Sequence, residues 1–69
     1  MARTYEIVVT GTASPLVRAA FEEFDVDELE GGRIRLVGVV ADEAALHGVL
    51  HRMQDLRLAI LELRRLEED

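Results

Sequence analysis

Three side chains at helical spacing are the first candidates for chemistry. Glu43, His47 and His51 recur every four residues, so they form one stripe along a helix. Two histidines at i and i+4 can share a metal ion, but a structural zinc site needs four ligands. Glu43 and His51 lie ~12 Å apart along a helix axis, and no other histidine or cysteine is present. We therefore expect a solvated helix face with an acid–histidine pair, and no metal or other cofactor.

Catalysis has no stronger candidate elsewhere in the chain. Ser14 is the only serine, and with Pro15 after it, it has the position of a helix N-cap rather than of a nucleophile. The acidic residues from 22 to 30 lack the apolar surroundings that make a carboxyl group a general acid. They suit a strand at the edge of a sheet, where charge prevents association with other sheets. We expect the protein to bind rather than to catalyse.

The composition limits the classes of partner. Sixty-nine residues make a single domain, 1–69, and with no cysteine the chain has no disulfide to stabilise its small core. Dimerisation is the remaining common way to do so. The formal net charge of −6 argues against nucleic acid and anionic membranes, because both need a basic face. There is no signal-peptide pattern and no apolar run of bilayer length, so we expect a cytoplasmic protein.

Six short segments that could position these side chains follow one another as strand, helix, strand, strand, helix, strand. Hydrophobic periodicity predicts strands over 4–10, 25–30, 33–40 and 58–65, and helices over 15–24 and 43–54. Ser14 and Asp42 are the expected N-caps, and Gly31-Gly32 is a hairpin signal. The composition of residues 56–66 also suits a helix. We favour a strand there, because the sheet would otherwise have only three strands.

The face of this sheet that points away from the helices is the most informative predicted surface. Alternation places Ile7, Val9, Ile34, Leu36, Leu61 and Leu63 under the helices. The apolar residues left on the other side are Val8, Val37, Val39 and Ile60, and the charged residues around them are Glu6, Arg35, Glu62 and Arg64. Monomers seldom expose such an apolar patch. We therefore expect this face to form a homodimer or to dock on a protein partner. The alternative is a half-wet face whose valines only reflect strand propensity.

The order of the predicted strands and helices is similar to that of a known fold. Residues 4–66 resemble the ferredoxin-like βαββαβ fold. The segment ADEAALHGVLHRMQDLRLAILELRRL resembles small uncharacterised proteins and ACT-like regulatory domains, in which a D-x-A-A-L-H-G-x-L helix leads into the last strand. The resemblance implies an α+β sandwich, with a four-stranded antiparallel sheet of order 4-1-3-2 and two helices on one face.

The resemblance leaves three functions open. The first, which we favour, is a non-catalytic interaction or regulatory module that dimerises through the open sheet face. The second is an ACT-like sensor of amino acids, with the ligand near Gly11, Thr12 and Ser14, although this loop lacks the acidic residue usual in ACT domains. The third is an accessory subunit or enzyme of a biosynthetic pathway. Metal chaperones of this fold carry Cys-x-x-Cys in the same loop, so metal transport is not expected.

Overall fold

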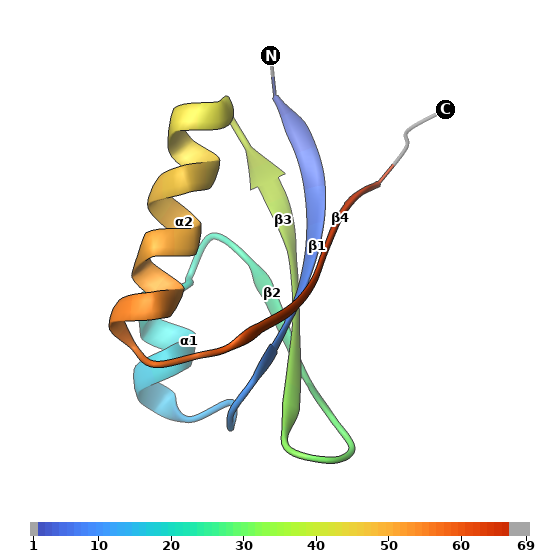
Figure 1. Ribbon diagram of the computed structural model, residues 1–69, viewed down its shortest axis with the longest axis vertical. Coiled ribbons are helices and arrows are strands. Elements are labelled where there is room, and N and C mark those ends of the chain that lie inside the picture. The colour runs from blue at the N-terminus through green and yellow to red at the C-terminus, as the bar shows by residue number, and fades with distance from the viewer. Residues whose placement is uncertain (1, 67–69) are drawn as a thin grey trace.

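Two helices lie on the same side of a four-stranded antiparallel sheet in the computed structural model, which describes residues 2–66 (Figure 1). The elements are β1 (Arg3–Thr10), α1 (Pro15–Ala20), β2 (Asp25–Leu29), β3 (Arg33–Val40), α2 (Glu43–Asp55) and β4 (Ile60–Leu66). The strand order is β2-β3-β1-β4, which is the predicted order read from the opposite edge. The α+β class is confirmed, and the last segment is a strand rather than a helix. Neither helix has the length and apolar run needed to cross a membrane in the part of the chain described.

Local signals in the sequence determine where the elements begin and turn. The Ser14 hydroxyl accepts a hydrogen bond from the Val17 N–H at 3.3 Å, and the Asp42 carboxylate accepts one from the Ala45 N–H at 2.8 Å. Both N-cap predictions are therefore confirmed. Gly31 and Gly32 have φ angles of 79° and 69°, which the predicted hairpin turn requires.

The first helix is shorter than its apolar stripe predicts. It ends at Ala20 rather than Phe24, because Phe21 leaves the helical conformation with φ −128° and ψ 48°. A turn closed by the Phe24 N–H and the Phe21 carbonyl oxygen, at 3.0 Å, then leads into β2. Both phenylalanines are still buried. The turn, rather than a third helical turn, brings the second ring onto the sheet.

The core lies between the helices and the two central strands. Its fully enclosed side chains come from β1, β3, α2 and the end of α1, and they are Ile7, Val9, Phe21, Ile34, Leu36 and Met53. Leu58, in the connection from α2 to β4, is also buried there. Ile7 lies opposite Leu36, and Val9 lies opposite Ile34, as the predicted alternation requires.

A β-bulge in β4 corrects one prediction about the sheet faces. The register pairs Val8 with Glu62 and Val9 with Ile60, so Leu61 is the extra residue. Ile60 therefore shares the face of Val9 and packs against the core. Its predicted place on the open face is wrong, because the extra residue shifts the alternation by one. Leu63 lies opposite Ile7, on the predicted face, but it remains 43% exposed.

Candidate protein-binding surfaces

An ion-pair network occupies the centre of the open sheet face. Glu6 on β1 lies opposite Arg64 on β4, and its carboxylate contacts the Arg64 guanidinium at 2.9 Å. The Arg35 Nε on β3 donates a hydrogen bond to the other carboxylate oxygen of Glu6. Asp27 on β2 lies 3.8 Å from the Arg35 guanidinium. The network therefore crosses all four strands, and Glu6 is only 7% exposed at its middle.

The two arginines stabilise the ionised form of Glu6. The hydrogen bond from Arg35 is the main cause that lowers the pKa of Glu6 below 4.5; burial opposes it, and the charge of Arg64 adds to it. A second lowered pKa is that of Glu23, whose carboxylate accepts a hydrogen bond from Arg52 on α2. Both carboxylates therefore stay charged in moderately acidic solution, and each links an element to its neighbour.

We expect the protein to lose stability in acid partly through Glu6. Its pKa is lower in the folded chain than in the unfolded chain, so the unfolded chain takes up the proton first as the pH falls. The contribution of Glu6 is thus complete above about pH 4.5 and is lost as the pH falls through the folded-state pKa. Urea unfolding of the wild type and of Glu6→Gln between pH 7 and pH 3 measures it.

The Glu6→Gln variant should be less stable at pH 7, and its stability should fall less steeply in acid than that of the wild type. An equally steep fall in both proteins would show that the network contributes nothing to the pH dependence. Asp25→Asn is the matched control, because Asp25 is an exposed carboxylate on the edge strand β2.

The apolar residues predicted for the open face do not form one continuous patch. Val8 is only 8% exposed, between Arg35 and Glu62 in the register, and long charged side chains can cover apolar surface in this way. Val37 is half-buried, and Val39, near the end of β3, is 63% exposed. Of the predicted charged residues, the structure joins Glu6, Arg35 and Arg64.

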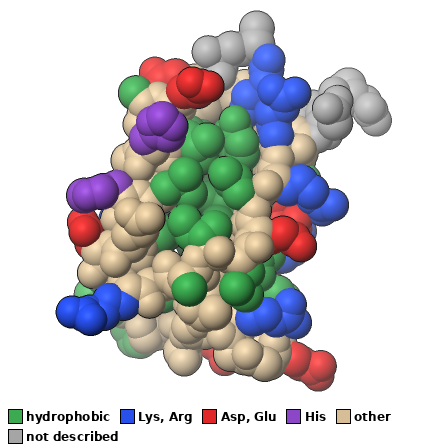
Figure 2. Space-filling model, viewed as in Figure 1, with side chains coloured by type: hydrophobic (Ala, Val, Ile, Leu, Met, Phe, Trp, Pro, Cys, Tyr) green, Lys and Arg blue, Asp and Glu red, His purple; other side chains and the backbone are tan. Residues whose placement is uncertain are grey.

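An apolar surface does appear, but beside the edge strand β4. Leu61 and Leu63 are 53% and 43% exposed, and both lie in β4, which has a single neighbour in the sheet. Figure 2 shows hydrophobic side chains gathered between α2 and β4, with the two histidines on the α2 side. The sequence analysis missed this surface, because it assigned both leucines to the covered core. The predicted strand order already placed this strand at the edge of the sheet, with a helix over its neighbours only. This was the signal from which the exposed surface could have been predicted.

The predicted ligand loop is held by contacts within the chain. The Gly11 N–H donates to the Gly32 carbonyl at 2.8 Å, and the Ser14 N–H donates to the Thr12 carbonyl at 2.8 Å. The Ser14 hydroxyl caps α1. A Cβ atom on Gly11, whose φ is 137°, would lie 2.8 Å from the Leu58 side chain. These contacts use the N–H groups of Gly11 and Ser14 and the Ser14 hydroxyl within the chain.

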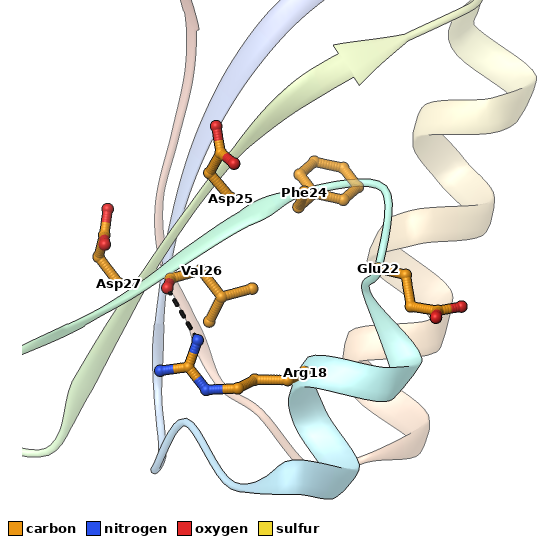
Figure 3. Close-up of a pocket in the computed structure, with 6 residues that line it drawn as sticks. All are labelled: Arg18, Glu22, Phe24, Asp25, Val26 and Asp27. Carbon is orange, nitrogen blue, oxygen red and sulfur yellow. Dashed lines mark hydrogen bonds between the residues drawn. The ribbon is translucent and has the colours of Figure 1, made fainter.

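A shallow depression of about 490 Å³ lies between α1 and β2. Arg18 reaches across it, and its guanidinium donates to the Val26 carbonyl at 3.2 Å and to the Ala13 carbonyl at 3.3 Å. Figure 3 shows Asp25 and Asp27 pointing away from Arg18. The charged groups that line the depression therefore do not converge on one point. Arg18 instead covers the outer edge of β2.

The histidine stripe of α2 lies in solvent. Glu43, His47 and His51 are exposed, and the His51 Nδ1 atom lies 3.5 Å from the Asp55 carboxylate one turn along the helix. Among residues 2–66, no three His, Cys, Asp or Glu side chains are placed together as a metal site would require.

A family of proteins matches most of this chain. The model of a family described as "Domain of unknown function (DUF8691)" matches residues 4–64, which run from β1 into β4. No curated protein and no solved structure matches the chain.

Proposed function

This chain belongs to the DUF8691 family, and because that family has no known function, we propose from the structure that the protein is a non-catalytic interaction module that acts as a homodimer. The observation that carries the proposal is the exposure of Leu61 and Leu63 on an edge strand beside an apolar surface (Figure 2). We also propose that the fold is ferredoxin-like and of the ACT-like kind. The element order and the strand order β2-β3-β1-β4 support this.

Binding has more support than catalysis because the polar side chains bond to one another. Glu6, Arg35 and Arg64 are joined in one ion-pair network, and Glu23 is paired with Arg52. Arg18 is engaged with backbone carbonyl groups of its own chain. A catalytic site needs polar groups that converge on an empty space, and the described residues supply none. The apolar side chains of Leu61 and Leu63 on β4, in contrast, remain exposed and are available for contact with a partner.

The β4 side has more support as the binding surface than the open face. On the open face, Val8 is covered, Val39 is exposed, and the other apolar residues, Val37, Leu29 and Leu66, are half-buried. On β4, exposed leucines adjoin backbone N–H and C=O groups that have no further strand beside them among residues 2–66. Such an edge binds other strands unless it is protected, so apolar contact and backbone hydrogen bonds coincide there.

We expect the wild-type protein to be a dimer at micromolar concentration, and Leu63→Asp to dissociate it. A carboxylate at the centre of an apolar contact must be desolvated, so the dimer Kd should rise more than about tenfold. Leu16→Asp is the matched control, because Leu16 is 66% exposed on α1 and lies outside the proposed surface. Light scattering or sedimentation measures the mass, and circular dichroism verifies that each variant is folded.

A Leu63→Asp variant that dimerises as well as the wild type would rule out the β4 surface. If Val37→Asp then produced monomers, the open face would be the interface. A wild type that remains monomeric at hundreds of micromolar would contradict self-association altogether.

A further inference from the structure

We propose that two copies of this chain pair along β4, antiparallel, about a two-fold axis at Leu63, so that the two sheets become one continuous sheet. The proposal rests on the proposed homodimer and deepens it, because it names the strand, the register and the residue pairs. Three features of the described residues carry it, namely the direction of the β4 backbone groups, the order of charges along β4 and the protection of the opposite edge.

The backbone of β4 presents hydrogen-bonding groups to a second strand at Leu63 and Arg65. Alternate residues of an antiparallel strand direct their N–H and C=O groups to opposite neighbours. The Thr10 N–H bonds to the Ala59 carbonyl at 2.9 Å, and the Gly11 N–H bonds to the Gly32 carbonyl at 2.8 Å. Even-numbered residues of β1 therefore direct their backbone N–H and C=O groups toward β4, and odd-numbered residues direct theirs toward β3.

The same alternation continues into β4. Glu6 and Val8 lie opposite Arg64 and Glu62, so these two β4 residues direct their backbone groups inward. Leu63, between them, directs its N–H and C=O groups outward. A two-fold axis at Leu63 places Leu63 and the partner's Leu63 opposite one another as a hydrogen-bonded pair. Their side chains then meet on the helix side of the joined sheet, where Leu63 is otherwise 43% exposed.

The charges along β4 select this register. With the axis at Leu63, Glu62 lies opposite the partner's Arg64 at two symmetry-related positions. These are non-hydrogen-bonded pairs, in which side chains approach most closely, and opposite charges there stabilise the pairing. An axis at residue 62 would oppose two glutamates, and an axis at residue 64 would oppose two arginines. The sequence Glu62-Leu63-Arg64 is thus complementary to itself only about its central leucine.

The other edge of the sheet is closed, so the pairing ends at a dimer. Arg18 bonds to the Val26 carbonyl on the outer side of β2, and the Glu28 side chain accepts a hydrogen bond from the Ala13 N–H at 3.3 Å. These contacts tie α1 and its preceding loop to β2 and block the approach of another strand. A two-fold contact that uses each β4 once gives a closed dimer rather than a filament.

Single-cysteine cross-linking tests the register directly, because the chain has no cysteine of its own. Opposite residues of a hydrogen-bonded pair have Cα atoms ~5.5 Å apart, within the range that a disulfide spans. Under mild oxidation, Leu63→Cys should form covalent dimers at least about tenfold faster than Leu16→Cys, although Leu16, which lies on α1 and remote from the axis, is the more exposed of the two positions. Non-reducing electrophoresis over time measures both rates.

A charge variant tests the same register without a covalent bond. Glu62→Arg places two arginine pairs across the axis, and the dimer Kd should rise about tenfold. Glu62→Gln removes the attraction without adding repulsion, so its effect should be smaller. High salt should reduce the difference between these two variants.

Two outcomes would overturn the register. Either Leu63→Cys cross-links no faster than Leu16→Cys, or Glu62→Arg dimerises as tightly as the wild type. With a dimeric wild type, such a result would refute the β4 pairing and leave the interaction module in place. With a monomeric wild type, both proposals would fail together.

Discussion

Replacing Phe21 with alanine is expected to lower the free energy of unfolding by about 3–5 kcal/mol. Phe21 is fully buried, and its ring lies edge-to-face with that of Phe24 at 6.3 Å between centroids. The Arg52 guanidinium lies 5.1 Å from the Phe21 ring centroid, while Arg52 also bonds to the Ala20 carbonyl and to Glu23. The alanine variant would lose the ring's burial and leave a cavity where α1, α2 and the sheet meet.

A loss of this size is comparable with the whole stability of so small a domain. Circular dichroism during urea unfolding at 25 °C measures it, and much of the Phe21→Ala protein should be unfolded before urea is added. Leu16→Ala is the control on the same helix, and because Leu16 is 66% exposed, its effect should stay within about 0.5 kcal/mol. A Phe21→Ala variant that loses less than about 1 kcal/mol would contradict the assignment of Phe21 to the centre of the core.

Gly38→Ala is expected to destabilise the fold by about 1–3 kcal/mol, although it only adds a methyl group. Gly38 lies on β3 opposite Tyr5, and a Cβ atom there would come within 2.7 Å of the Phe24 ring and 3.1 Å of the Glu23 carbonyl oxygen. The ring and the turn after α1 would both have to move. For a domain of this size, each kcal/mol lowers Tm by roughly 4–8 °C, so a thermal melt measures the effect.

Gly48→Ala is expected to have the opposite effect on the stability of the same chain. Gly48 lies inside α2, and a Cβ atom there would meet no other group within 4 Å. Alanine should therefore stabilise the protein by up to ~1 kcal/mol, because glycine is unfavourable inside a helix. If both glycine variants changed stability in the same direction, the close approach of Phe24 to β3 would not be a constraint on the fold.

The candidate surface shows where reasoning from sequence was incomplete. Strict alternation along residues 58–65 predicted Leu61 and Leu63 in the core and Ile60 on the open face. The structure keeps Leu63 on the predicted face but exposed, and it moves Ile60 to the core side. A single extra residue, Leu61, causes the shift, and a bulge leaves no pattern in the sequence because it depends on how two strands are paired.

The open face of the sheet differs from its prediction for a related reason. Glu6, Arg35 and Arg64 were placed around an apolar patch, because alternation identifies a residue's face but not the path of its side chain. In the structure Glu6 is buried between the two arginines, and Val8 is covered. The ion pairs of Glu6 with Arg35 and Arg64 make the centre of the face charged rather than apolar.

The sequence alone determined the features that depend on neighbouring residues. The Ser14 and Asp42 caps, the Gly31-Gly32 turn and the order of the six elements all follow from local hydrogen bonding, backbone freedom and periodicity. Only the tertiary structure decided the end of α1, the close packing of Phe24 on Gly38, the bulge at Leu61 and the burial of Glu6. Each of these depends on a contact between residues distant in sequence, whose energy exists only after the elements have packed.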